Sequence, residues 1–268
     1  MARRNATAYA PSDEGNYHHH VNPAKWRDLR WPTCIKEINV RFLNGSYQQK
    51  LLVADLVREH YNTIPMSVKF RFFLEPEGDS DIRVLFVKMG DSHSYVGVSN
   101  LIVPEQKPTM MLNLEHKNPD NNKNTILHEF GHALCLEHEH QHPGSGIRLN
   151  RRALLKGKNT NAECIDDNYE IQPSLFCPWR TEPYDRHSVM HYGFSKGQLR
   201  DPEAYILVNP AVSQGDRNQL LQMYPLKESH KPKLLYTTAD SKKLTRGIFE
   251  ATKKESRWAK FFLRVKGR

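Results

Sequence analysis

The feature that most constrains this chain is a cluster of histidines between His128 and His138. A His-Glu-x-x-His pattern begins at His128 and ends at His132, and a third histidine, His138, follows six residues later. Residues four apart on a helix lie on one face, so the first two imidazoles can reach one ion. The chain must turn after His132 to bring His138 back. The spacing therefore predicts a helix that ends in a turn beside a metal.

Zinc suits this set of side chains because it takes imidazole nitrogen and is usually four-coordinate. Three protein ligands, His128, His132 and His138, would leave one position for water. Glu129 could face that position as a general base, while zinc lowers the pKa of the water to about 7 and polarises a carbonyl. Such a site predicts hydrolysis of amide bonds. A His-Glu-x-x-His pattern alone also arises by chance on amphipathic helices, and the third histidine weakens that alternative.

A second motif lies further along the chain, at Ser188-Val189-Met190-His191-Tyr192. Met190 stands 52 residues after His138. The motif is typical of the methionine turn that passes beneath the metal in metzincins. A methionine in a short apolar segment is otherwise core filling. Beside a complete histidine motif, the methionine turn is the favoured interpretation.

These residues resemble the astacin family of zinc metallopeptidases over roughly residues 26 to 225. The stretch from Asp81 to Met110 is also similar to astacin-type proteins of microbes and fungi. Astacins continue the third histidine with Glu, here Glu139, and place a Tyr two residues after the turn methionine, here Tyr192. In the family the matching Glu anchors a new N-terminal ammonium. For Glu139 that role stays open, and the alternative is a carboxylate that orients local backbone.

The resemblance implies a role for each residue of the two motifs. His128, His132 and His138 would be the zinc ligands and Glu129 the general base. Met190 would form the floor of the site. Tyr192 would be a fifth, switchable ligand that swings away and donates a hydrogen bond to the tetrahedral oxyanion.

The implied fold is α+β and metzincin-like, with a twisted mixed β-sheet, an active-site helix and an irregular, mainly helical lower half. The implied function is that of a zinc-dependent metalloendopeptidase with one zinc per chain, whose zinc-bound water is activated by Glu129. The alternative is a catalytically weak or inactive metal-binding homologue that acts as a binding protein. A protein or peptide substrate and a monomeric state are expected.

Cys135 departs from the metzincin pattern, which has Gly three residues after the second histidine. Glycine there lets the backbone take positive φ where the helix ends. Another residue costs on the order of 1 kcal/mol, so either the turn relaxes or the strain is carried. The thiol could also compete as a ligand or oxidise, but packing as a small apolar group is the favoured interpretation.

Charge and composition divide the chain into three parts. Residues 227–268 hold 13 Lys and Arg against 4 Asp and Glu, so the whole net charge of +9 lies there, and the other 26 basic residues balance 26 acidic ones. We expect a disordered arm at residues 1–25, an astacin-like domain at 26–226 and a basic extension at 227–268. The extension could bind anionic membrane, acidic protein or nucleic acid, or be a solvated appendage.

Targeting signals and cysteines bear on where the chain acts. No stretch approaches the ~20 apolar residues of a membrane span. The first 20 residues lack the apolar core of a secretory signal, so a cytoplasmic or unconventionally exported protein is expected, or a secreted one if the true start lies upstream. Four cysteines allow two disulfides, and Cys164 with Cys177 is the expected pair.

Hydrophobic periodicity predicts the elements that frame the site. Strands are expected at residues 35–43, 68–74, 82–87, 95–98 and 110–114. Helices are expected at residues 47–62, 149–156, 162–169, 216–224 and 244–265. The active-site helix is expected to start at Asn124 or Thr125 and to end near Cys135.

Three smaller expectations concern the rim of the site. The segment 94–100 is the candidate edge strand against which an extended substrate would pair. His140 and His142 are expected to be loop residues, because the ligand count is met without them. Arg180 and Arg186 are candidates for a preference for acidic substrate residues.

Overall fold

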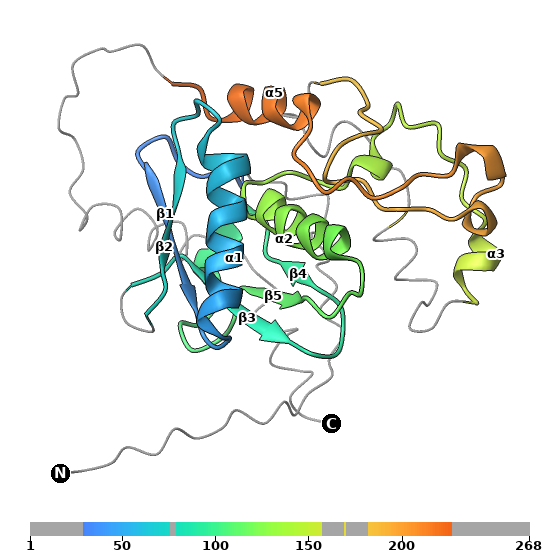
Figure 1. Ribbon diagram of the computed structural model, residues 1–268. Helices are drawn as coiled ribbons and strands as arrows, with labels where there is room; N and C mark the ends of the chain where they lie inside the picture. The colour runs from blue at the N-terminus through green and yellow to red at the C-terminus, as the bar shows by residue number, and fades with distance from the viewer. Residues whose placement is uncertain (1–28, 76–78, 157–168, 170–181, 227–268) are drawn as a thin grey trace, which may run out of the picture.

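The structure is a computed structural model and describes residues 29–75, 79–156, 169 and 182–226 (Figure 1). Its centre is a five-stranded sheet in the order β2-β1-β3-β5-β4. The strands are β1 (Glu37–Phe42), β2 (Lys69–Phe73), β3 (Ile82–Val87), β4 (His93–Ser94) and β5 (Met110–Asn113). Neighbouring strands pair in parallel except β4, which is antiparallel to β5. The predicted mixed sheet is confirmed.

Alternation of side chains along the strands decides which face of the sheet is buried. In β1 the buried residues are Ile38, Val40 and Phe42, while Glu37 is exposed. In β2 the buried residues are Phe70 and Phe72. Side chains two apart in a strand lie on one face, so these residues form a single apolar surface. That surface packs against the helices that carry the site.

Helix α1 (Tyr47–Val57) starts where the sequence predicts. Ser46 caps it, and its hydroxyl accepts from the Gln49 N–H while the Gln49 side chain accepts from the Ser46 N–H. This reciprocal pair satisfies two backbone donors that the first turn leaves open. The helix continues as a wider π-helical turn, η2 (Arg58–Asn62), so the predicted helix over 47–62 is confirmed.

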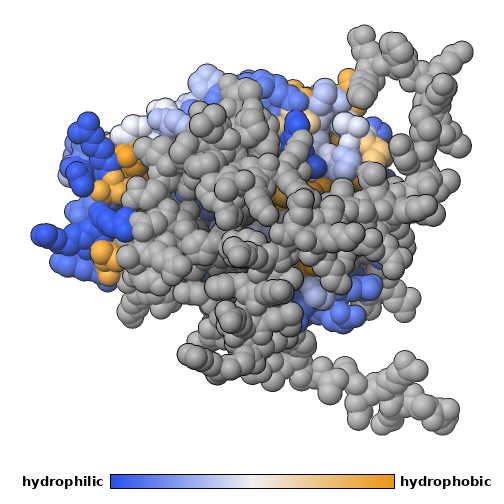
Figure 2. All heavy atoms as spheres, turned by 180° about the vertical axis from the view of Figure 1, so that it is seen from behind, coloured by the Kyte–Doolittle hydropathy of each residue, from blue (hydrophilic) through white to orange (hydrophobic). Residues whose placement is uncertain are grey.

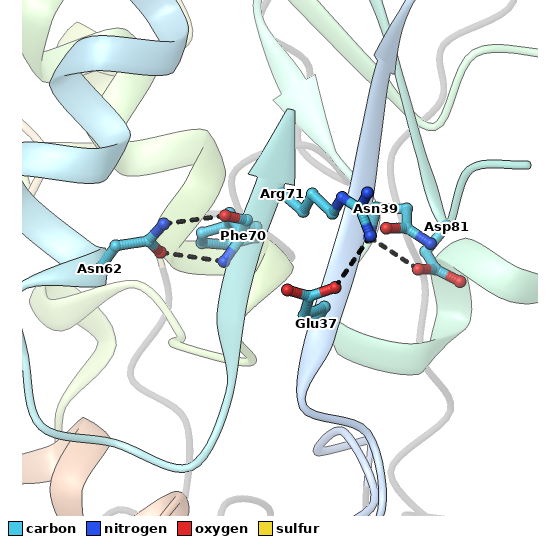
Figure 3. A network of polar contacts seen from close by, with 6 residues as sticks. All are labelled: Glu37, Asn39, Asn62, Phe70, Arg71 and Asp81. Carbon is cyan, nitrogen blue, oxygen red and sulfur yellow. Dashed lines mark hydrogen bonds and ion pairs between the residues drawn. The ribbon is translucent and has the colours of Figure 1, made fainter. Parts of the chain in front are cut away.

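Side-chain contacts to the backbone of β1 and β2 help to hold these strands in place (Figure 3). The Asn62 amide donates to the Phe70 carbonyl at 2.8 Å, and its oxygen accepts from the Phe70 N–H at 2.9 Å. On the other side, the Asp81 carboxylate accepts from the Asn39 N–H at 2.8 Å. The Asn62 bonds give backbone groups of the edge strand β2 partners that a missing strand cannot supply, whereas the Asp81 bond links the interior strand β1 to the residue before β3.

Helix α2 (Pro119–Ala133) carries the first two histidines and lies beside α1 over the apolar face of the sheet (Figure 1). Its N-cap is Asn118, so the predicted start at Asn124 or Thr125 is wrong. Asn118 accepts from the Asp120 N–H, and Pro119 at the first position needs no donor partner. Asn124 lies inside the helix and donates to the Asn209 carbonyl.

The predicted strand at 95–98 is also wrong. The edge strand β4 ends at Ser94, and residues Gly97–Ile102 form a 3-10 helix, η3. Gly97 has φ of 50°, and a Cβ there would run into the Leu29 carbonyl, to which the Val98 N–H donates. This close approach bends the chain out of the sheet. Of the expected substrate strand 94–100, only Ser94 belongs to the edge.

The lower half is irregular and mainly helical, as predicted. Its short elements are η4 (Glu139–Gln141), α3 (Arg151–Leu154), η6 (Lys196–Gln198), η7 (Pro202–Ala204) and α5 (Gln214–Met223). A small second core of Phe194, Leu199 and Ile206 holds this half together. The rest of the predictions for 162–181, including Cys164, Cys177 and Arg180, and those for 1–25 and 227–268 lie outside the described residues.

The described surface is mainly hydrophilic on the face opposite to that of Figure 1, with single hydrophobic residues between (Figure 2). The large exposed apolar side chains, such as Met89 and Leu207, are scattered along the sequence. Among the described residues, no helix has both the length and the hydrophobicity to cross a bilayer.

Candidate metal centre

Cys135 ends the active-site helix in the left-handed conformation, with φ of 69°. The Cys135 N–H donates to the His132 carbonyl at 2.8 Å, and the Leu136 N–H donates to the Gly131 carbonyl at 3.0 Å. This is the Schellman arrangement that glycine usually closes. The backbone strain is therefore carried rather than relaxed. The Cys135 side chain is fully buried, which agrees with the predicted packing role.

Two aromatic side chains cap the last carbonyls of α2. The Trp31 indole N–H donates to the Ala133 carbonyl at 2.7 Å. The Tyr224 hydroxyl donates to the Leu134 carbonyl at 3.0 Å. Both rings are buried, so these bonds satisfy carbonyls that water cannot reach. The turn that follows is thereby held in place.

That turn brings the three predicted histidines together. One ring nitrogen each of His128, His132 and His138 lies within 4.8 Å of the others, and this is the one such group among the described residues. The Nε2 atoms of His132 and His138 are 3.1 Å apart. Such closeness of ring nitrogens suits ligation of one cation.

The second ring nitrogens of His128 and His132 each contact a backbone carbonyl. His128 Nδ1 lies 3.0 Å from the Val189 carbonyl, and His132 Nδ1 lies 2.9 Å from the Leu136 carbonyl. A carbonyl only accepts, so each Nδ1 carries the proton and each Nε2 is unprotonated, as a metal-ligating nitrogen must be. Burial lowers the pKa of His128 to about 4, although the bond to Val189 opposes the shift. His128 is thus neutral at physiological pH, as a metal ligand must be.

Glu129 lies beside this cluster on the same helix and is buried. Burial raises the pKa of its carboxyl group to about 8. Its Oε2 atom has no hydrogen-bond partner within the part of the chain that the structure describes. A buried carboxyl oxygen with no partner is costly unless a ligand completes it. Together with the converging histidine nitrogens, this carboxyl oxygen fits a hydrated metal ion.

The methionine turn is held by a buried carboxylate on α5. Asp216 accepts from the Ser188 hydroxyl at 2.5 Å and from the Val189 N–H at 2.9 Å. It also accepts from the Ser213 N–H at 2.9 Å. Burial raises the pKa of Asp216, and these bonds oppose the shift. Since the Val189 carbonyl receives His128, the carboxylate orients a candidate ligand through the backbone of a single residue, Val189.

Met190 is buried directly under α2, where the sequence predicts the floor of the site. Its sulfur lies against Gly131, at the place a Cβ on that glycine would occupy. The Met190 carbonyl accepts from the Glu139 N–H at 3.0 Å. The Glu139 carboxylate accepts from the Asp185 N–H at 2.9 Å. Glu139 thus holds the backbone of Asp185, 46 residues further along the chain, which agrees with the alternative of a carboxylate that orients backbone.

Tyr192 packs against the histidine cluster. Its ring centroid lies 4.4 Å from that of His138 and 5.6 Å from that of His128. The same ring is partly buried and packs against the small second core of the lower half. The structure thus brings Tyr192 beside the three histidines from a different part of the chain.

The structure agrees with the prediction for one of the two rim histidines, His142, and not for the other, His140. His142 lies in a turn and contacts the Glu182 carbonyl through Nε2, as expected of a loop residue. His140 stands outside the three-histidine group, but it is buried in η4 rather than placed on a loop. Arg186 is exposed and donates to the Tyr205 carbonyl.

Sequence reasoning missed two residues that shape the site, Asp216 and His140. The sequence predicts a helix from Asp216, but not that Ser213 caps it in a capping box with Asp216 or that Asp216 reaches the methionine turn. Nothing local indicates its partner Ser188, which lies 28 residues away. His140 offers no signal beyond its closeness to His138.

The sheet, the helix end and the converging histidines define the metzincin-like, α+β class predicted from the sequence. The chain belongs to the astacin family, since the profile of the Astacin peptidase family matches residues 42–207. Zinc metalloproteinase nas-12 of Caenorhabditis elegans is 29% identical over 126 residues, which cover 45% of this chain and 27% of that protein. The matched part thus spans about a quarter of the length of this relative.

Solved structures give the same fold. A structure of myroilysin is 26% identical, with a TM-score of 0.64 over 75% of this chain and 98% of that one. A crystal structure of myroilysin, also 26% identical, gives 0.55 over 74% and 87%. High choriolytic enzyme 1, a hatching enzyme zinc-protease from the medaka fish Oryzias latipes, is 16% identical with a TM-score of 0.50 over 73% and 92%. This last likeness concerns the fold alone.

Proposed function

We propose that the chain is a zinc-dependent metalloendopeptidase that binds one zinc ion and cleaves protein or peptide substrates. The observation that carries this proposal is the convergence of three histidine nitrogens within 4.8 Å beside a buried, partnerless Glu129 oxygen. Membership in a family of peptidases supports it. The protein is proposed to act as a monomer.

His128, His132 and His138 would hold the zinc through the ring nitrogens that converge within 4.8 Å. For His128 and His132 these are the Nε2 atoms, since Nδ1 of each lies against a backbone carbonyl. Zinc, when bound, supplies Lewis acidity that polarises the scissile carbonyl and lowers the pKa of water. The Nδ1 bonds of His128 and His132 to carbonyls keep both rings oriented. The buried Met190 side chain packs against the active-site helix and excludes water from that side of the site.

Glu129 would take a proton from the attacking water and pass it to the leaving amine. Its raised pKa of about 8 in the metal-free protein reflects how strongly its site disfavours an isolated charge. A cation nearby would favour the charged form and bring the pKa back towards the working range of a base. Tyr192 would donate a hydrogen bond to the carbonyl oxygen as negative charge develops on it.

Cleavage of an unstructured protein such as casein tests the proposal. Purified protein with its zinc content measured would be compared with Glu129→Gln, which keeps size and removes the base. We expect cleavage by the wild type at about one zinc per chain and a loss of at least ~10²-fold in the variant, since general base catalysis typically contributes that much. Glu59→Gln, a change of an exposed glutamate on η2, is the matched control.

The alternative is an inactive metal-binding homologue, and Cys135 is the feature that favours it. The strained turn at this residue leads to His138, so a distortion there would alter the geometry of the ligand set. Bound zinc in the wild type without cleavage, and cleavage gained by Cys135→Gly, would support this alternative. Equal activity of the two proteins would exclude a disabling role for Cys135.

A further inference from the structure

We infer that His140 is a positioning residue for Tyr192 and supplies the flat surface on which the phenol ring rests. This inference builds on the proposed function, in which Tyr192 assists at the metal. His140 lies two residues after His138, in the short helix η4. Its side chain is 1% exposed, so it is as buried as a core residue.

The ring of His140 lies between the histidine cluster and the core of the lower half. It stacks on Tyr192 with centroids 4.4 Å apart and planes 26° apart. It also stacks on His138 at 5.2 Å and 28°. Phe194 meets it edge-on at 5.5 Å. One imidazole thus contacts both a candidate ligand and the candidate switch residue.

This stack is the closest near-parallel contact of the Tyr192 ring. Among the described residues, its other ring contacts are inclined, at 54° to His138, 34° to His128 and 70° to Tyr169. A parallel face fixes the tilt of an aromatic ring but lets it slide within its own plane. A tyrosine that moves towards and away from a metal needs both a fixed ring tilt and freedom to move within the ring plane. His140 therefore guides the phenol without binding the ion itself.

The backbone of Tyr192 is fixed independently of this stack. The His191 Nδ1–H donates to the Tyr192 carbonyl at 2.7 Å. The Tyr184 hydroxyl lies 2.9 Å from His191 Nε2 and donates to it. A change at His140 would therefore leave the main chain in place and alter the position of the phenol ring. The effect should appear in reactions that use the hydroxyl group.

Two substitutions at His140 distinguish the effect of a planar ring from the effect of side-chain volume. His140→Phe keeps a planar ring, whereas His140→Leu fills the space without one. We expect His140→Phe to keep most of kcat and His140→Leu to lose about tenfold, less than the ~10²-fold typical of deleting an oxyanion donor. KM and zinc content should stay unchanged in both. Equal loss in the two variants would overturn the inference. His187→Ala, which removes an exposed imidazole, is the control.

A double-mutant cycle asks whether His140 acts through Tyr192. If it does, His140→Leu costs little further activity once Tyr192→Phe has removed the hydroxyl. If the two losses multiply, His140 acts on general stability and the inference is wrong.

A spectroscopic readout is independent of turnover. The protein is prepared with copper(II) in place of zinc. A phenolate bound to copper(II) absorbs visible light by charge transfer, so the absorption band reports whether Tyr192 reaches the metal. The band should vanish in Tyr192→Phe, shift or weaken in His140→Leu and persist in His140→Phe. A band identical in wild type and His140→Leu would refute the positioning role alone. Absence of a band from the wild type would refute Tyr192 as a ligand, and with it the proposed mechanism on which this inference rests.

Discussion

The sulfur of Met190 occupies the space in which a side chain on Gly131 would begin. Gly131 lies in the last turn of the active-site helix, between two candidate ligands. Glycine in a helix interior costs about 1 kcal/mol relative to alanine. Here the cost is offset because no other residue lets the methionine turn come so close to the helix.

Gly131→Ala should therefore destabilise the protein by about 1–3 kcal/mol, the usual range for overpacking a core. In a Met190→Ala background the sulfur is gone, and the Tyr61 hydroxyl, 3.1 Å from the added Cβ, is the nearest remaining neighbour. The same change should then cost less, because alanine favours the helix by up to about 1 kcal/mol and the largest overlap has been removed. Urea denaturation of the four proteins measures both values. If Gly131→Ala costs as much in the Met190→Ala background as in the wild type, the contact with Met190 does not explain the glycine.

The strain at Cys135 can be measured by comparing two small replacements. Cys135→Gly and Cys135→Ala both remove the thiol, but only glycine adopts φ of 69° without a steric cost. We expect the glycine variant to have the higher free energy of unfolding, by about 1 kcal/mol. A more stable alanine variant would show that the turn relaxes on substitution.

The stability of the metal-free protein should depend on pH through two buried groups. The pKa of His128 is lowered from 6.5 to about 4, so its contribution is complete above pH 6.5 and is lost as pH falls towards 4. The pKa of Glu129 is raised from 4.5 to about 8, so its contribution is complete below pH 4.5 and is lost as pH rises towards 8.

Between pH 4.5 and 6.5 the two slopes oppose each other and should nearly cancel. Above pH 6.5 only the Glu129 slope remains, and stability should fall by up to about 1.4 kcal/mol per pH unit until pH 8. Melting temperatures of chelator-treated protein between pH 4 and 9 test this profile. In Glu129→Gln the fall above pH 6.5 should disappear, and its persistence there would assign it to another group.

Asp216→Asn should weaken both the fold and zinc binding. An amide has one acceptor oxygen where the carboxylate uses two, so at least one of the donors Ser188, Val189 and Ser213 loses its partner. We expect a loss of about 2–3 kcal/mol in stability. Zinc affinity should fall about 10- to 100-fold, because the Val189 carbonyl no longer holds His128 in place.

The matched control for Asp216→Asn is Asp55→Asn, which changes an exposed carboxylate paired with Arg58. Exposed pairs contribute about 0–1 kcal/mol, so little change is expected. Zinc affinity is best measured by competition with a coloured chelator. Reduced stability with unchanged zinc affinity in Asp216→Asn would contradict the proposed link between α5 and His128.

What could be predicted from the sequence depends on how local each signal is. His128 and His132 are tied by helical spacing, and Met190 and Tyr192 stand in one short motif, so the structure brings these residues to the positions expected. The helix start was missed because the first turn of α2, Pro-Asp-Asn-Asn, has no apolar period. The Asn-Pro pair at Asn118 is the signal that could have marked it.

The features that were not predicted depend on contacts with residues far away in the sequence. Asp216 matters because Ser188 and Val189 lie against it, and the expected strand at 95–98 fails because the Leu29 carbonyl approaches Gly97. The apolar residues Tyr95, Val96 and Val98 give no sign of that approach. Contacts between segments far apart in the chain are decided by the whole fold, which a local pattern does not contain.

The capping of the active-site helix by Trp31 and Tyr224 bears on how the protein is made. These residues come from opposite ends of the described chain, and both lie outside the span that the family profile matches. During synthesis the helix can form and pack on the sheet, but its last turn stays open until Tyr224 has left the ribosome. The turn that carries His138 to its partners is thus among the last parts of the domain to settle. A nascent or truncated chain that ends before Tyr224 would hold the complete histidine motif and still lack a finished metal centre.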